Sequence, residues 1–180
     1  MSRLLATAAA LPGLSPQAHL LSFTVGQKLH RLKQSGWNTA LLATDAHAPA
    51  TLSVFTHENL HDLRLLEALT AWKAATLQGF TSTFTPTVER TRTWARDQLL
   101  ARDDRALFIV RSAEVAIGHL GLSNYDDAVR AMEMDSVIRG EASTPADVMH
   151  LAGRAVLDFA KRELGLRTVM AGVLCANALT

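Results

Sequence analysis

The sequence is nearly free of cysteine, since Cys175 is the only one among its 180 residues. A single thiol excludes an internal disulfide framework and fits a reducing, cytoplasmic environment. Cys175 lies in an apolar stretch, which favours a buried, inert thiol over a nucleophile. The sequence therefore gives no indication of a small secreted fold held together by disulfides.

The sequence also lacks an excess of charge of one sign. Its 18 Lys and Arg residues face 17 Asp and Glu residues, for a formal net charge of +1. This balance provides no field that would attract nucleic acid or an acidic membrane, and no apolar run is long enough to span a bilayer. Residues 1–14 resemble a signal peptide only weakly, because Thr7 interrupts the apolar run and Pro12 ends it. We therefore expect neither a nucleic-acid partner nor a membrane partner.

What the chain does contain is sufficient apolar content, 48% of residues, for one compact domain with a substantial core. The first 50 residues are weakly patterned, although 25–37 reads as a short basic helix ending near Gly36 and 38–45 as a possible strand. Residues 51–55 are the first clear strand. We therefore divide the chain into an N-terminal region of unclear structure, 1–50, and a domain, 51–180.

The stretch HENLH, residues 57–61, matches H-E-x-x-H, a pattern in which two histidines one helical turn apart hold zinc. His57 would be the first residue of its helix, where side chains fray. Arg64 and Glu67 stand where the extended zinc motif has glycine and histidine. We therefore expect no metal site, and interpret these histidines as solvated side chains on the first turn of a helix.

The middle of the sequence predicts two helices, after which the spacing of apolar residues changes from a helical pattern to short, strand-like runs. One helix runs from about His57 to Ala75 with Thr56 as its N-cap, and another spans 89–100 after Pro86. Three short apolar runs follow, at 105–112, 115–123 and 131–139. The first two suggest a hairpin, although the linking residues Ala113 and Glu114 are weak turn formers.

The third run alternates like a strand. One face is expected to carry Met132, Met134, Ser136 and Ile138, and the other Glu133, Asp135, Val137 and Arg139.

A polar segment, a helix and a last strand follow this third run. The segment 141–147 leads into a helix predicted at 148–164 and a strand predicted at 167–175. A strand, helix and strand in this order suggest a parallel crossover, whose helix N-terminus is suited to a phosphate or pyrophosphate. From these residues alone, an anion site and an ordinary strand-to-helix connection both remain open.

Three segments together resemble the GCN5-related N-acetyltransferases (GNAT): IGHLGL, EMDSVIRG and LGLRTVMAGVLCAN, within residues 57–180. The resemblance implies an α/β fold, a GNAT-like mixed sheet flanked by helices. Family members continue beyond the position of Thr180 into a further helix and further strands, so we expect the sheet to lack that part. The implied function is transfer of acetyl from acetyl-CoA to a primary amine of a small molecule, for example an amino sugar.

The resemblance also implies where acetyl-CoA and the catalytic base lie. The acetyl-CoA amides would pair with the main chain near Val137 and Ile138, the pyrophosphate would lie between Arg139 and Met149, and Asn177 would contact the pantetheine arm. The cofactor-binding residues expected are Val137, Ile138, Arg139, Gly140, Val148, Met149 and Asn177, and the expected catalytic base is Glu133. Asp135, on the same face as Glu133, is expected to raise the pKa of Glu133 by like-charge repulsion.

Two departures from the family pattern keep an alternative open. Pro145, Ala146 and Asp147 stand where the family usually has glycine before the helix, and they bring a negative charge toward a pyrophosphate. The part that normally supplies a tyrosine acid lies beyond Thr180, and Tyr125 lies in the wrong place to replace it. The alternative is an inactive remnant that binds CoA or a partner chain, with a homodimer as one form, and a zinc hydrolase is a third, weaker hypothesis.

Overall fold

The computed structural model describes residues 23–41, 50–76, 85–140 and 146–172. These residues form one sheet with the strand order β1-β2-β3-β4-β5-β6, in which neighbours are antiparallel except for the parallel pair β5 and β6. The strands are β1 (Asn38–Leu41), β2 (Ala50–Val54), β3 (Ala106–Ser112), β4 (Val115–Asp126), β5 (Ala131–Arg139) and β6 (Thr168–Ala171). The expected α/β fold, with a mixed sheet flanked by helices, is confirmed, and so is the parallel crossover.

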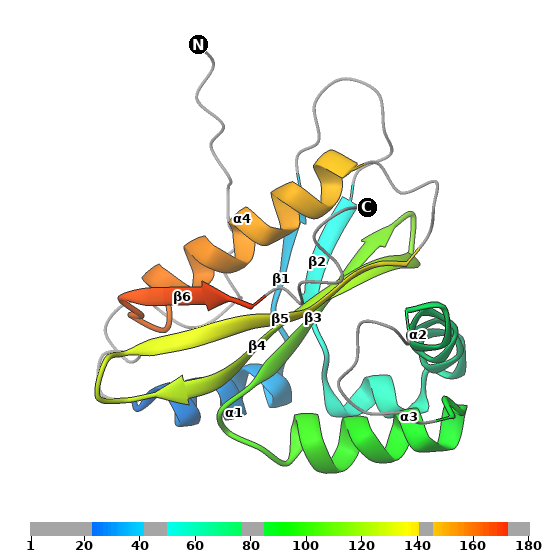
Figure 1. Ribbon diagram of the computed structural model, residues 1–180, viewed down its shortest axis with the longest axis horizontal. Helices are drawn as coiled ribbons and strands as arrows, with labels where there is room; N and C mark the ends of the chain where they lie inside the picture. Colours follow the sequence, from blue (N-terminus) through cyan, green and yellow to red (C-terminus); the bar gives the residue numbers. More distant parts are fainter. Residues whose placement is uncertain (1–22, 42–49, 77–84, 141–145, 173–180) are drawn as a thin grey trace.

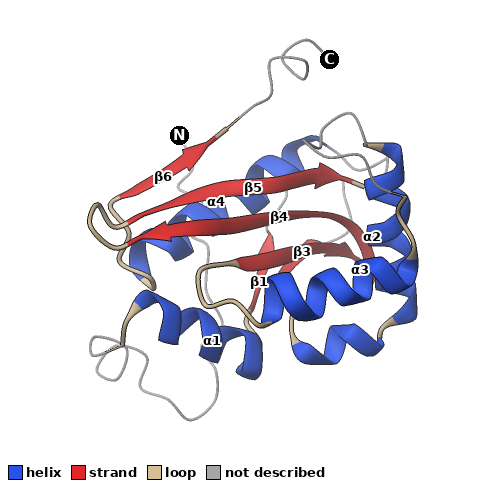
Figure 2. Cartoon of the chain, turned by 60° about the horizontal axis from the view of Figure 1, so that its bottom comes forward, coloured by secondary structure: helices blue, strands red, loops and turns tan. Residues whose placement is uncertain are grey.

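Helices cover both faces of the sheet and define two cores (Figures 1 and 2). The first core joins the sheet to α1 (Val25–Ser35) and α4 (Ala146–Arg162). The second joins it to α2 (Leu63–Ala75), α3 (Val88–Trp94) and the π-helical η4 (Ala95–Leu100). Alternate strand residues feed the two cores: Phe108, Leu120 and Met132 enter the first, and Leu107, Ile109 and Ala116 enter the second.

The N-terminal helix agrees with the sequence prediction. Helix α1 begins with a capping box between Thr24 and Gln27 and ends at Gly36, whose φ of 73° favours glycine. The strand predicted at 38–45 is β1, which is described only to Leu41. Residues 1–22, with their weak signal-like pattern, and Cys175 lie outside the described residues.

A buried lysine connects α1 to the far end of the second helical layer. Lys33 is 1% exposed, and its Nζ donates to the main-chain carbonyls of Leu99, at 3.1 Å, and Arg102. These carbonyls lie at the end of η4, where the last turn lacks intrahelical donors. Burial lowers the pKa of Lys33. The hydrogen bonds compensate for much of the cost of burying its ammonium group.

The single helix predicted from residue 57 is in fact two helices. His57–His61 form a 3₁₀ helix, η2, and α2 begins only at Leu63. The N-cap of α2 is Asp62, whose Oδ1 accepts from the main-chain N–H of Leu65 at 3.0 Å. Aspartate caps a helix better than it continues one, because its carboxylate competes for main-chain donors. Thr56 is the N-cap of η2 rather than of α2.

The expected alternation along β5 is wrong beyond Asp135, because the strand contains a β-bulge. Gly121 pairs with Asp135 and His119 pairs with Ile138, so two steps along β4 face three along β5. Ser136 has a φ of 50°. Such a bulge shifts the alternation by one residue. Met134 therefore packs on the first core and Ile138 on the second, whereas the sequence pattern placed both on one face.

The hairpin between β3 and β4 is confirmed, and its turn is strained. Ala113 and Glu114 have φ values of 45° and 68°. Two central residues with positive φ define a type I′ turn, which strongly favours Asn-Gly. A left-handed conformation costs a non-glycine residue roughly 1–2 kcal/mol.

We expect the double variant Ala113→Asn, Glu114→Gly to be more stable than the wild-type protein by about 1–2 kcal/mol, because both new residues tolerate positive φ. Thermal unfolding should show a midpoint higher by roughly 2–8 °C. Glu114→Ala is the matched control, since it removes the same carboxylate but keeps the Cβ. A gain of equal size in the control would contradict the explanation by backbone strain.

Candidate active site

The outer edge of β5 is paired over only part of its length. β5 pairs with β4 as far as Arg139, but with β6 only from Ala131 to Met134. β6 spans only Thr168–Ala171, the four residues that pair with this segment. Among the described residues, no strand pairs with the outer edge of 135–139, the segment that contains the bulge. Main-chain donors and acceptors of an unpaired edge can bind an extended ligand as an added strand would.

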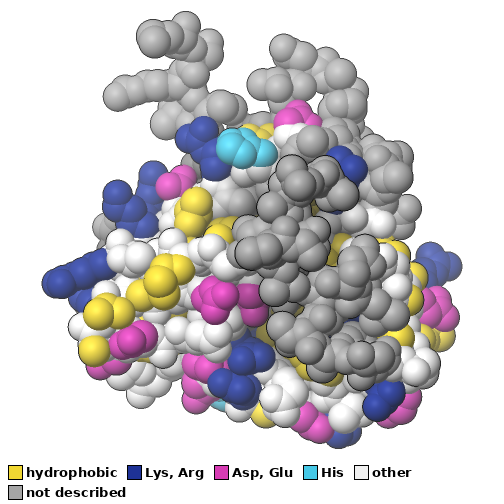
Figure 3. Space-filling view, viewed as in Figure 1, with side chains coloured by type: hydrophobic (Ala, Val, Ile, Leu, Met, Phe, Trp, Pro, Cys, Tyr) yellow, Lys and Arg dark blue, Asp and Glu magenta, His cyan; other side chains and the backbone are white. Residues whose placement is uncertain are grey.

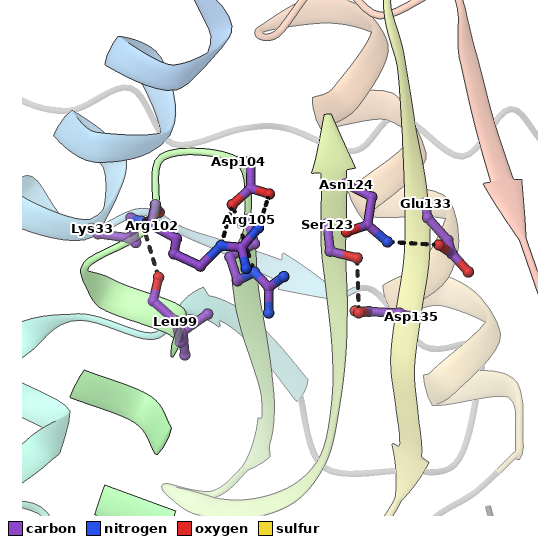
Figure 4. A network of polar contacts seen from close by, with 9 residues as sticks. All are labelled: Lys33, Leu99, Arg102, Asp104, Arg105, Ser123, Asn124, Glu133 and Asp135. Atoms are coloured by element: carbon purple, nitrogen blue, oxygen red, sulfur yellow. Dashed lines mark hydrogen bonds and ion pairs between the residues drawn. The ribbon is translucent and has the colours of Figure 1, made fainter. Parts of the chain in front are cut away.

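Two carboxylates precede the bulge on one face of the sheet (Figure 4). Asp135 Oδ2 accepts a hydrogen bond from Ser123 Oγ at 2.8 Å, and Glu133 Oε2 accepts one from Asn124 Nδ2 at 2.9 Å. Gly121 leaves the space that the Asp135 carboxylate fills, because a Cβ at this position would collide with Oδ1. Both carboxylates are thus held in place by residues of β4.

Burial raises the pKa of Asp135 above its ordinary value. The hydrogen bond from Ser123 and the charge of Arg105 oppose this shift, while the charge of Glu133 adds to it. The Arg105 guanidinium is mostly buried, with Nε 3.7 Å from Asp104. Raised carboxyl pKa values in a partly buried setting are typical of groups that exchange protons at neutral pH. Asp135 is therefore a candidate base that the sequence analysis treated only as a neighbour of Glu133.

The predicted cofactor residues of β5 lie together at its C-terminal end. Val137 is 58% exposed and Arg139 is also exposed, whereas Ile138 turns into the second core. Gly140 donates its main-chain N–H to the Ile117 carbonyl at 2.9 Å. Any side chain at Gly140 would collide with the Trp72 indole, so packing within the protein already requires this glycine. A larger residue at position 140 would consequently test that packing rather than ligand approach.

The first turn of α4 lies beside this end of β5. Gly118 pairs with Arg139, and a Cβ at Gly118 would lie 2.8 Å from Met149 Sδ. Val148 is buried in the first core, so only its main chain is available to a ligand, and Asp147 is exposed. The structure thus brings Val148 and Met149 close to Arg139. Asn177 and the connecting segment 141–145 lie outside the described residues.

A buried polar cluster beneath the bulge was missed by the sequence analysis. It consists of Trp72 and Lys73 of α2, Trp94 of α3 and His119 of β4. The Trp72 and His119 ring centroids are 5.8 Å apart, and Lys73 Nζ lies 3.5 Å from the Trp94 ring centroid. The signal was a histidine inside the otherwise apolar run IGHLGL, which indicates a buried polar group when it occurs in a central strand.

The HENLH stretch does not have the geometry of a zinc-binding helix. His57 and His61 are exposed and belong to a 3₁₀ helix. Side chains four residues apart lie about 120° apart around a 3₁₀ axis but only about 40° apart around an α-helix. In the described part of the chain, no group of three or more His, Cys, Asp or Glu residues could hold a metal ion.

Charged side chains of both signs are interspersed on the described surface in Figure 3. Most ion pairs are local and largely exposed, such as Arg96 with Asp97 at 2.6 Å and Arg92 with Glu89 at 2.7 Å. Exposed pairs of this kind contribute little to stability.

A helix capable of crossing a membrane does not occur in the described ranges.

The chain belongs to the acetyltransferase (GNAT) domain family, whose model matches residues 37–179. The family is defined by acetyl transfer, with acetyl-CoA as co-substrate. The match begins just before β1 and includes all six strands described above. The resemblance inferred from the three sequence segments is therefore confirmed.

Solved structures with the same fold are distant in sequence. A probable acetyltransferase of the GNAT family from Chromobacterium violaceum has 22% identity and a TM-score of 0.58, with 77% of this chain and 70% of that chain covered. FdhC, a nucleotide-linked sugar GNAT, has 16% identity and a TM-score of 0.58, with 72% and 71% covered. A spermidine N-acetyltransferase SpeG chimera from Vibrio cholerae and hSSAT has 18% identity and a TM-score of 0.51, with 71% and 73% covered. No curated protein matches the chain.

The raised pKa of Asp135 predicts a pH-dependent effect on stability. The pKa of Asp135 is higher in the folded state than in the unfolded state. Ionisation of this carboxyl group therefore lowers the free energy of unfolding as the pH rises from the unfolded-state pKa through the folded-state pKa. We expect Asp135→Asn to gain stability relative to wild type at neutral pH and to lose that advantage toward about pH 3, below the usual aspartate pKa. Urea denaturation across this range measures the difference, with Asp158→Asn, on an exposed part of α4, as the control. An advantage that does not vary with pH would refute the assignment.

Proposed function

We propose that this protein is an N-acetyltransferase that transfers acetyl from acetyl-CoA to a primary amine of a small molecule. The observation that carries the proposal is the bulged edge of β5, which pairs with no second strand among the described residues and lies beside the first turn of α4, directly after two carboxylates. Membership of the GNAT family supplies the reaction class. The acceptor amine and the roles of individual residues are likewise proposed.

The residues at this edge fit acetyl-CoA. The outer main chain of 135–139, to which no described strand is paired, suits the amides of a pantetheine arm, and the exposed Arg139 suits a pyrophosphate. The N-terminal turn of α4 adds the positive end of a helix dipole, which favours an anion such as a pyrophosphate. We assign the binding of acetyl-CoA to Val137, Ile138, Arg139 and Gly140, to the main chain of Val148 and Met149, and to Asn177.

Acetyl-CoA supplies a thioester carbonyl that an uncharged amine can attack. A C–N bond forms to the carbonyl carbon, the C–S bond breaks and the thiolate leaves, while the amine loses one proton. Glu133 accepts that proton, directly or through water, and Asp135 is the second candidate for this role. A main-chain N–H at the bulge is suited to donate to the carbonyl oxygen as negative charge develops on it.

The acceptor is proposed to be a small cationic amine in solution. Two carboxylates on one face would attract an ammonium group before its deprotonation, and the partly buried setting strengthens that attraction. The nucleotide-linked sugar and spermidine acetyltransferases with similar folds suggest amino sugars and polyamines as the first acceptors to test. A CoA-binding protein without turnover, with or without a partner chain, is the alternative proposal, favoured by Asp147 at the start of α4.

Turnover separates these two proposals. With acetyl-CoA and either spermidine or glucosamine, release of CoA thiol should be measurable for the wild type. Loss of a general base typically lowers kcat about 10²- to 10⁴-fold, so Glu133→Gln should do so while acetyl-CoA affinity stays within about twofold. Glu67→Gln, an exposed change on α2, is the control. If Asp135→Asn alone gave this loss, the base would be Asp135; acetyl-CoA binding without thiol release from any amine would favour the alternative.

Two opposite charge changes locate the pyrophosphate. Arg139→Ala should weaken CoA binding by about one to two decades, the loss expected for a charge-assisted contact. Asp147→Asn should strengthen binding, because it removes a negative charge beside the pyrophosphate. Isothermal titration calorimetry measures both, and Asp158→Asn, farther along the same helix, should leave affinity unchanged. Unaltered binding in both variants would place the pyrophosphate elsewhere.

A further inference from the structure

His119 is a buried histidine without a hydrogen-bond partner among the described residues. Its side chain is 2% exposed, and both ring nitrogens are buried and unpaired. The ring lies on the second-core face of β4, where β3 contributes Ile109 and β5 contributes Ile138 as its cross-strand neighbours. A buried polar group left in this state is uncommon and calls for a structural or functional reason.

The surroundings of His119 point to the bulge. Ser136 lies in the bulge between the residues that pair with Gly121 and His119, so its main chain is close to the imidazole, although neither ring nitrogen makes a hydrogen bond to it. This main chain acts to raise the pKa of His119, but burial and the positive charge of Lys73 have larger, opposite effects and lower that pKa to about 4. Among the charged groups facing the ring, Lys73 is the one that acts on it appreciably. The ring is therefore neutral near pH 7, with one N–H available to donate toward the carbonyl of the bulge.

Helix α2 holds the ring in that position. The Trp72 indole packs on His119 at 36° between ring planes and also covers Gly140. The next residue, Lys73, is 8% exposed and lies over the Trp94 ring, and burial lowers its pKa to about 8. A single indole therefore contacts the histidine beneath Ser136 and the residue that follows β5. The segment 136–140 is supported from one side by α2.

We propose that His119 is a positioning residue, which supports the β5 bulge through the main chain of Ser136 and thereby sets the shape of the acetyl-CoA edge. The proposal rests on the proposed function for its consequence in binding, but its structural part concerns the free protein. His119 touches neither acetyl-CoA nor the amine in this scheme. Its effect reaches them through the backbone of 136–140.

Replacement by leucine separates positioning from simple packing. His119→Leu fills a similar volume and removes the unpaired ring nitrogens, so a purely space-filling role predicts equal or higher thermal stability with no local change. Positioning predicts that the amides of 135–140 exchange with deuterium about tenfold faster, without a loss of Tm. His119→Gln, which retains a side-chain N–H, should restore most of the protection. Hydrogen-exchange mass spectrometry on the full chain measures this.

Ile109→Val is the matched control. It removes one methylene from the cross-strand neighbour of His119 on β3, destabilises the same core and leaves β5 untouched. In this control, the amides of 135–140 should exchange with deuterium at the wild-type rate. If Ile109→Val loosened 135–140 as much as His119→Leu did, or if His119→Leu left that segment unchanged, the positioning role would be overturned.

Acetyl-CoA binding gives the second measurement. We expect His119→Leu to raise the Kd of acetyl-CoA about tenfold and His119→Gln to stay within about threefold of wild type, as measured by calorimetry. If the exchange result holds but acetyl-CoA binds neither wild type nor variants, the proposed function fails and the support of the bulge stands. If acetyl-CoA binds all variants equally, the bulge does not depend on His119 for its binding shape and this inference fails.

Discussion

The partial pairing of β5 is the constraint on which the candidate site depends. Buried main-chain groups need partners, and β5 meets that need toward β4 along nearly its whole length. Toward β6 the pairing ends at Met134, one residue before Asp135 and two before the bulge at Ser136. The bulge also reverses the direction of the following side chains. A bulged edge that no second described strand covers and a pair of carboxylates therefore occur within one strand.

The two helical layers hold that strand from opposite faces. On the first face, Met149 of α4 fits against Gly118, which pairs with Arg139. On the second, Trp72 of α2 lies over Gly140. Both contacts need a glycine, because a Cβ at either position would overlap a neighbouring side chain. Gly118 and Gly140 therefore allow the two helices to approach the end of β5 closely, and their role is in packing.

The buried polar groups differ in how well they are satisfied. Lys33 donates to two carbonyls at the end of η4, and Asp135 accepts from Ser123. His119 has no such partner among the described residues, although it lies beside the bulge. A satisfied polar group mainly fixes the fold, whereas an unsatisfied one stores free energy that a small backbone shift can release. This contrast sets His119 apart from Lys33.

The sequence by itself determined most of the succession of helices and strands along the chain and the crossover helix, because hydrophobic periods and capping residues act locally, and three of its segments indicated the family. It also placed Glu133 and Arg139 on one strand. The bulge could not be read from it, since Ser136 breaks the alternation only through pairing with β4. The predicted 57–75 helix is split at Asp62, which caps α2 and also lies 3.5 Å from Arg111 of β3. Tertiary structure alone brought Trp72 and Lys73 of α2 to His119 of β4, because these two elements are separated in sequence and meet only in the second core.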